Sequence, residues 1–363
     1  MTGTWVLYLP LIKSKFALND GQIGMALFCL ALGLLISIPF IPIINKKIGV
    51  GNSTKWGVLL FALSFNLPLV VSSYLTLCLS LLLIGLLSGF TDVSMNALVS
   101  AIEKRDAKYF MSSAHGFFSL GGFIGAGVGS IFIGRISDPA LHILIVSSFI
   151  VISNLYLSTF YKVIKEVATP KMEKENRLKN IQPLLGLAIV AFIIMLNEGA
   201  VEHWSNLFLF DVIQVQANQA GFGFIAFSLC MTLGRFLGDG ISKKIGSYNI
   251  INSGTVIALV GYVCIISASF YITVLGFGIL GLGLSVIIPE LFRLAGNTKG
   301  VSASVGISIV SGIGFAGFLI GPVLLGFISN WSNLTWSFTF LLFSILLVLA
   351  LVFFRFKRNW NVT

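Results

Sequence analysis

The sequence predicts an all-α polytopic membrane protein, on two compositional observations and one of pattern. Its 363 residues are 56% apolar and only 10% charged, and the mean hydropathy is +0.98. A soluble domain carries about 25% charged residues, so most of this surface is unsuited to water. Apolar runs of about 18 residues or more recur along the whole chain, and each is long enough to cross a bilayer as a helix. The runs lack the alternation of barrel strands, which leaves helices as the spanning elements.

We expect eleven full spans and part of another. The full spans are predicted at 22–44, 56–72, 74–100, 109–134, 140–161, 183–211, 219–241, 250–269, 271–294, 302–328 and 335–356. The opening stretch, Met1 to Pro10, is apolar but only about half as long as the roughly 20 residues that a crossing needs. We interpret it as the outer half of a first helix whose beginning is absent. The expected design is therefore twelve transmembrane helices with a truncated first one.

A polar segment at 162–182, rich in charges of both signs, separates an N-terminal bundle (1–161) from a C-terminal bundle (183–363). The two bundles share a short internal repeat. Ile44-Asn45-Lys46-Lys47-Ile48-Gly49 follows one span, and Ile241-Ser242-Lys243-Lys244-Ile245-Gly246 follows another, at an offset of 197 residues (241 − 44). Two parallel six-helix repeats joined by a polar loop are one of the arrangements of secondary transporters, with a site at the repeat interface near the midplane.

The formal charge of +10 reflects membrane topology and does not indicate a nucleic-acid partner. Of the 23 Lys and Arg residues, only Lys13, Lys15 and Arg135 are assigned to loops on one side, while Arg235 and Arg293 lie within spans. The others are assigned to loops on the opposite side and to the tail after Phe354, which the positive-inside rule makes cytoplasmic. The four cysteines all fall within apolar spans at unrelated spacings, so neither disulfides nor a metal site is expected.

Several motifs resemble a known family. The segment Gly234-Arg235-Phe236-Leu237-Gly238-Asp239, continuing through Lys243 and Lys244, resembles the loop motif of the major facilitator superfamily, although Pro42 stands where the repeat would place a second aspartate. The stretches that resemble the YbjJ-type group of bacterial inner-membrane facilitators begin at Asp92, His115, Glu198 and Ala226. The resemblance covers nearly the whole chain and implies a multi-pass transporter of a bacterial inner membrane, without identifying its cargo. It also implies that Gly234, Arg235, Asp239, Lys243 and Lys244 form a gating motif.

Ionisable residues inside spans are costly and are therefore functional candidates. Asp92 and Asn96 are one turn apart on one helix face, and His115 lies at a similar depth on the next helix. A carboxylate beside an imidazole would suit proton binding, whereas the alternative is a structural hydrogen bond that joins the two helices.

The seventh helix of the expected design supplies Glu198, Glu202, His203 and Trp204. Glu198 and Glu202 share a face, so mutual repulsion would favour a proton on one of them. Trp204 offers a stacking surface for a sugar-like ring or a cation, or else belongs to the outer aromatic belt.

Arg235 and Asp239 are expected to form a gating pair at a cytoplasmic helix end, while Glu290 and Arg293 are expected to form a surface ion pair at the cytoplasmic mouth. Small residues predict close helix packing, and a Gly-Pro pair predicts a hinge. These positions are Gly121, Gly125, Gly129, Gly317 and Gly321, with Pro322 completing the hinge.

The sequence favours a monomeric, proton-coupled symporter of a small polar solute that is neutral or cationic. Proton-driven export of amphipathic compounds and a non-transporting, inactive membrane protein remain as alternatives. No catalytic cluster, phosphate-binding loop or metal-ligand pattern stands out, so we expect neither an enzyme nor a cofactor.

Overall fold

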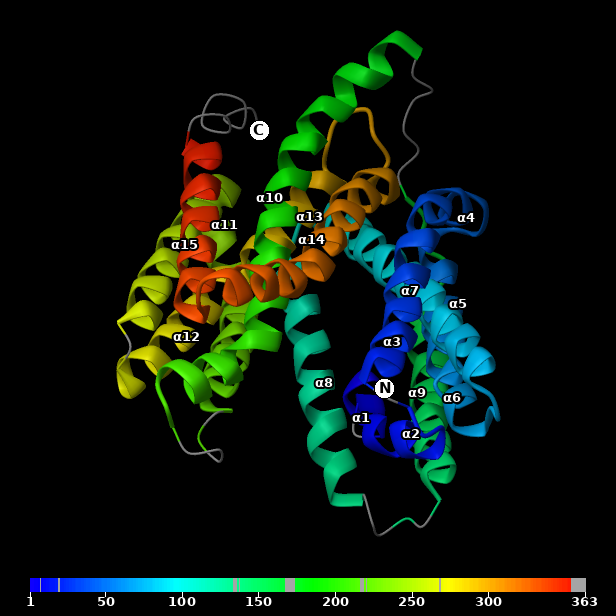
Figure 1. Ribbon diagram of the computed structural model, residues 1–363. Coiled ribbons are helices and arrows are strands. Elements are labelled where there is room, and N and C mark those ends of the chain that lie inside the picture. The colour runs from blue at the N-terminus through cyan, green and yellow to red at the C-terminus, as the bar shows by residue number, and fades with distance from the viewer. Residues whose placement is uncertain are drawn as a thin grey trace. The chain divides into compact units, whose positions relative to one another are not determined.

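The computed structural model describes residues 1–6, 8–18, 20–132, 136, 138–166, 174–215, 219, 221–267 and 269–353. Arg135, Lys171 and the basic tail that starts at Arg355, which entered the topology prediction, lie outside these residues. The described elements are all helical except for an isolated bridge at Ile136. The prediction of an all-helical membrane protein is therefore confirmed (Figure 1).

The chain divides into two compact units. Unit 1 comprises Met1–Ala107, Phe117–Pro170 and Ser302–Ser308. Its helices are α1 (Thr2–Val6), α2 (Leu9–Lys15), α3 (Asp20–Ser37), the 3-10 turn η1 (Ile38–Phe40), α4 (Ile41–Ile48), α5 (Val50–Ser64), α6 (Leu67–Val70), α7 (Tyr74–Asp106), most of α8 (Met111–Phe132) and α9 (Pro139–Tyr161).

Unit 2 comprises Lys108–Gly116, Lys171–Val301 and Ile309–Thr363. Its helices are α10 (Lys174–Leu207), the π-helical turn η2 (Phe208–Val212), α11 (Phe222–Ile266), α12 (Phe270–Ser285), α13 (Ile287–Gly296), most of α14 (Ala303–Trp331) and α15 (Leu334–Leu351). The first turn of α8 thus belongs to unit 2, and the first turn of α14 belongs to unit 1. Helix α10 begins at Lys174, inside the polar segment that separates the predicted bundles.

Nine helical segments of the described chain are long and apolar enough to span a bilayer. One of them, Phe222–Ile266, contains Gly246 at φ 80° and ψ 162° and is therefore two helices joined at that residue, as the predicted spans 219–241 and 250–269 require. Helix α8 covers the remaining predicted span, 109–134.

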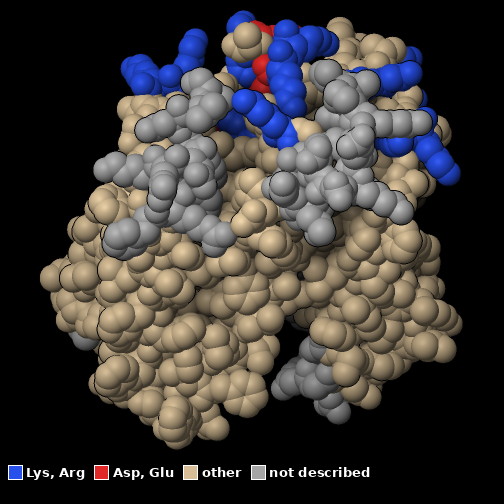
Figure 2. All heavy atoms as spheres, turned by 90° about the horizontal axis from the view of Figure 1, so that it is seen from above, with Lys and Arg blue, Asp and Glu red and all other residues tan. Residues whose placement is uncertain are grey.

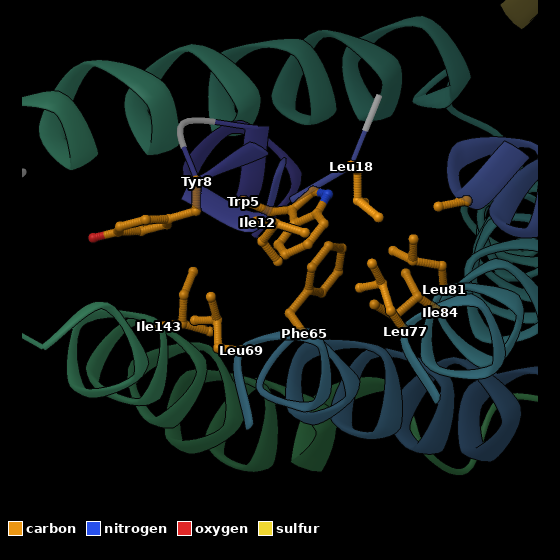
Figure 3. Close-up of a cluster of buried hydrophobic side chains, with 11 residues drawn as sticks. Trp5, Tyr8, Ile12, Leu18, Phe65, Leu69, Leu77, Leu81, Ile84 and Ile143 are labelled. Atoms are coloured by element: carbon orange, nitrogen blue, oxygen red, sulfur yellow. The ribbon is translucent and has the colours of Figure 1, made fainter. Parts of the chain in front are cut away.

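The opening residues are part of the core of unit 1. Trp5 is 3% exposed, and its ring lies 6.2 Å from that of Phe65. Thr4 Oγ1 donates to the backbone oxygen of Gly125 at 3.0 Å, and the Tyr8 hydroxyl lies 2.5 Å from His142 Nδ1. Apolar side chains of α1 and α2 therefore fill a space among α5, α7 and α9 (Figure 3). The cluster contains Trp5, Tyr8, Ile12, Leu18, Ala26, Phe65, Leu69, Leu77, Leu81, Ile84 and Ile143.

Glycines allow α14 to pack against α10 in unit 2 (Figure 1). A Cβ at Gly317 would lie 2.1 Å from the backbone oxygen of Phe192, and one at Gly321 would lie 2.4 Å from that of Leu196. The two backbones therefore approach too closely for larger residues at these positions.

The predicted glycine stripe of α8 differs from that on α14. Among the described residues, a Cβ at Gly121 would meet nothing within 4 Å, so the expected close contact is not seen there. A Cβ at Gly125 would lie 3.3 Å from Thr4 Oγ1, and Gly129 is buried.

Exposed basic residues follow the helix ends that the sequence assigns to the cytoplasm. Lys46 and Lys47 end α4, Lys104 and Arg105 end α7, and Lys243 and Lys244 precede the break in α11. Figure 2 shows lysine and arginine side chains gathered on the face in view, with few acidic ones among them.

The internal repeat has the same backbone conformation in both units. Gly49 (φ 85°, ψ 147°) and Gly246 (φ 80°, ψ 162°) adopt a combination that is essentially restricted to glycine. Gly246→Ala should therefore destabilise the protein by about 1–3 kcal/mol, although a Cβ there meets nothing within 4 Å.

Thermal unfolding of the purified protein in detergent checks this prediction. Gly240→Ala is the matched control, because that position is equally open but lies in helical backbone, where alanine is favoured over glycine by about 1 kcal/mol. Equal melting temperatures for the two variants would contradict the prediction.

Candidate functional site

Asp239 of α11 binds residues from two other helices of unit 2. It forms an ion pair with Arg293 of α13 at 2.6 Å. It also accepts hydrogen bonds from the backbone N–H groups of Ser112 at 3.0 Å and Ser113 at 2.7 Å, and from the Ser113 hydroxyl at 2.5 Å. Ser112 and Ser113 belong to the first turn of α8, whose N–H groups have no partner within the helix. The carboxylate therefore caps this helix and interacts favourably with its dipole.

Arg293 joins Asp239 to a second acid. Its guanidinium pairs with Glu290, donates to Ser242 Oγ at 3.1 Å and lies over the ring of Tyr109 at 4.3 Å. Glu290 accepts hydrogen bonds from Ser242 at 2.8 Å and from Ser247. The expectation of a surface pair was wrong, because Glu290 and Arg293 are only 2% and 3% exposed. Burying these charges carries a desolvation penalty, which the hydrogen bonds of Ser242 and Ser247 help to offset.

A third ion pair joins α10 to α11. Arg235 Nη2 lies 3.1 Å from Glu198 Oε1, and the two side chains are 10% and 20% exposed. Arg235 was expected to pair with Asp239, one turn along the same helix. The structure instead joins Arg235 to Glu198 and Asp239 to Arg293. Partners on neighbouring helices thus bind both members of the expected pair.

His115 lies close to Arg235 of this third pair. Its ring packs against Phe292 with centroids 5.7 Å apart, and it lies close enough to Arg235 to interact with its positive charge. Ser112, one turn earlier in α8, donates its hydroxyl to the backbone oxygen of Arg235 at 2.7 Å. The proximity of His115 to Asp92, which belongs to unit 1, stays a prediction.

The remaining candidates on α10 have local roles in the structure. His203 Nδ1 donates to the backbone oxygen of Gly199 at 2.7 Å, and Trp204 Nε1 donates to that of Pro322 at 3.0 Å. Trp204 is thereby hydrogen-bonded to α14 at the Gly-Pro pair. Helix α14 continues through Pro322 to Trp331. Glu202 is exposed.

Asp92 occupies the middle of α7 in unit 1. Its Oδ2 atom is buried and meets no hydrogen-bond donor among the described residues, and the same holds for Oδ1 of Asn96. The Asn96 side chain donates to the backbone oxygen of Asp92 at 2.9 Å. The two residues therefore present two acceptor oxygens on one face of an apolar helix.

Several polar partners were not found by sequence reasoning. Ser112, Ser113, Ser242 and Ser247 are ordinary small residues in the sequence, and only their position beside a buried charge gives them a role. The internal repeat, which aligns Ser242 with Asn45, was a sequence feature that could have drawn attention to Ser242. Among the described residues, no group of three or more His, Cys, Asp or Glu side chains is arranged to hold a metal ion. Gly234 and Gly238 leave room for neighbours, with the hydroxyls of Ser285 and Ser112 each 2.2 Å from the place of a Cβ.

The comparisons with known proteins agree with this architecture. Residues 1–295 and 187–359 match the model of the Major Facilitator Superfamily. An uncharacterized MFS-type transporter of Yersinia pestis is 30% identical over 348 residues, which cover 93% of this chain and 87% of that protein. The membrane protein MosC of Rhizobium meliloti is 28% identical over 368 residues, covering 98% and 87% of the two chains.

Solved structures share the fold at low sequence identity. The MFS transporter FucP in an outward conformation has a TM-score of 0.83 at 17% identity, covering 98% of this chain and 96% of that one. The human organic anion transporter MFSD10 has a TM-score of 0.73 at 14% identity, with coverage of 96% and 89%. The family match spans both bundles together with the ion-pair network described above. The chain therefore belongs to the Major Facilitator Superfamily, as a multi-pass membrane transporter rather than an enzyme.

Proposed function

We propose that this chain is a proton-coupled symporter that imports a small polar solute, neutral or cationic, across a bacterial inner membrane by alternating access. Its C-terminus would be cytoplasmic, and its sequence motifs support a place in the YbjJ-type group. The observation that carries the proposal is the buried carboxylate of Asp92, whose Oδ2 meets no donor among the described residues.

An unpaired charge within a membrane helix is costly, whereas the protonated acid is neutral and supplies its own donor. A proton is the smallest ligand that satisfies an isolated carboxylate oxygen. Asn96 Oδ1, one turn away, is a buried acceptor of the same kind and could receive the hydrogen bond of a protonated Asp92. Asp92 is thus suited to bind a proton in one state and release it in another.

The Glu198–Arg235 pair supports a step that couples binding to movement. Both side chains retain some exposure, so the pair lies within reach of water or solute. A solute hydroxyl or amine that replaces one partner would release the other, and protonation of Glu198 would do the same. Such a pair links occupancy of the site to the contact between α10 and α11.

The charge of the cargo follows from the arginines. Arg235 and Arg293 are the cations within the predicted spans, and carboxylates neutralise both. An anionic solute would have to compete with these buried acids for its counter-charge. A neutral or cationic solute, such as a sugar, polyol or amine, meets no such competition. A solved neighbour of the same fold, with a TM-score of 0.79 and 16% identity, is described as a fucose:proton symporter, which supports the proposal by fold alone.

Asp92→Asn removes the titratable group at nearly constant volume. We expect proton-driven solute accumulation in proteoliposomes to fall by about tenfold or more, since ~1.4 kcal/mol of coupling free energy corresponds to one decade. Solute exchange without a proton gradient should continue. The assay is substrate-induced current and uptake over a panel of sugars, polyols, amines, amino acids and carboxylates.

Asp211→Asn, at an exposed acid that follows α10, is the matched control and should retain accumulation. Undiminished accumulation by Asp92→Asn would remove this residue from the coupling mechanism. Silence of the unaltered protein across the panel would overturn import and leave export or a non-transporting role.

Glu198→Gln and Arg235→Gln should each lower the free energy of unfolding by about 1–3 kcal/mol, because each removes one charge of a largely buried ion pair. The double substitution should cost less than the two single losses together. Thermal unfolding in detergent measures this difference. Glu202→Gln, one turn away and exposed, should change stability little, and strict additivity of the first two substitutions would contradict an energetic pairing.

A further inference from the structure

Corresponding helix ends in the two units are bound by different residues. In unit 2, the Asp239 carboxylate binds the first turn of α8 through Ser112 and Ser113. The repeat offset of 197 residues, which aligns Gly49 with Gly246, places Pro42 at the position of Asp239. Proline has neither a carboxylate nor a side-chain donor. The first turn of α14, which belongs to unit 1, therefore receives no acid from this position.

A carboxylate nevertheless reaches the first turn of α14 from another part of the chain. Ser304, the second residue of α14, donates its hydroxyl to Glu166 Oε1. Asn45 Nδ2 donates to the same serine at 2.8 Å, and Ser94 donates to Asn45 Oδ1 at 2.9 Å. The neutral residues Asn45 and Ser94 thus join α4 and α7 to this serine, and Glu166 contributes the negative charge.

The backbone around Glu166 is well positioned for this contact. Ile164, two residues earlier, accepts a hydrogen bond from the N–H of Gly51 at 3.0 Å. The Lys165 side chain packs over Gly49, with its Cγ atom 3.2 Å from where a Cβ would lie. Glu166 also lies close enough to Lys104 of α7 to interact with its charge. The residues that follow α9 therefore pack against Gly49. The counterpart of Gly49 in the repeat is Gly246, which follows Asp239.

We propose that Glu166, at the start of the segment between the two sequence halves, is the positioning residue that replaces the carboxylate missing at Pro42. It holds the cytoplasmic end of α14 in unit 1, as Asp239 holds the cytoplasmic end of α8 in unit 2. Glu166 does so through one serine hydroxyl, whereas Asp239 binds two backbone N–H groups and the Ser113 hydroxyl of α8. The α14 end is thus the more easily released of the two, and its release depends on Glu166. A role of this release in gating rests on the proposed transport function, whereas the contact between Glu166 and Ser304 does not.

Hydrogen–deuterium exchange of the full chain in detergent tests the inference without requiring transport. Glu166→Ala should raise amide exchange in residues 302–308 by about tenfold, since a hydrogen bond to a charged acceptor is lost. Exchange in residues 108–116 should not change. Asp239→Ala should do the reverse, and Glu166→Gln, which retains an acceptor oxygen, should have a smaller effect than Glu166→Ala.

Asp106→Asn is the matched control, because this exposed acid at the end of α7 pairs with Arg105. Adding Pro42→Asp to Glu166→Ala should restore protection of residues 302–308, whereas adding Pro42→Ala should not. The inference is overturned if Glu166→Ala leaves residues 302–308 as protected as Asp106→Asn does, if it loosens both segments equally, or if Pro42→Asp fails to restore protection. Loosening of α14 in a protein that transports nothing would overturn the proposed function and leave the positioning role intact.

Discussion

The polar structure of this protein depends on one constraint: a charge buried among membrane helices must meet a partner there. Asp239 satisfies it with an arginine and the first-turn N–H groups of α8. Arg293 satisfies it by contacting two acids and the ring of Tyr109. The helices α8, α11 and α13 are consequently joined by the charges that they bury, and the small residues between them allow the approach.

The charged groups fall into two kinds. Glu290 and Arg293 are almost completely buried and are supported by serine hydroxyls, so separating them would leave several groups without partners at once. Glu198 and Arg235 form an ion pair at 3.1 Å and keep some exposure, and among the described residues no donor meets Oδ2 of Asp92. A transporter needs both kinds, because a rigid network defines each state and a weakly satisfied group can respond to a proton or a solute.

The internal repeat conserves backbone conformation and not chemistry. Gly49 and Gly246 adopt nearly the same dihedral angles at the ends of their helices. Any residue with a side chain would be strained in this conformation. The residues beside them have diverged, with Pro42 in place of an aspartate in one unit. A carboxylate at the same helix terminus can come from a different part of the chain, since the dipole of that helix requires a nearby negative charge and not a particular position in sequence.

The sequence by itself determined the helical membrane fold, the approximate spans and the pair of repeat glycines, because hydrophobic length and local conformation are properties of short segments. It also placed Asp92, Glu198, Arg235 and Asp239 inside spans, where a charge needs a reason. Only the tertiary structure decided which acid meets which arginine and that Glu290 and Arg293 are buried. The four-residue spacing of Arg235 and Asp239 allows a pair along one helix, yet α10 and α13 supply partners from the side. Ion pairing depends on distances between helices, and no local pattern in one helix records what its neighbours carry.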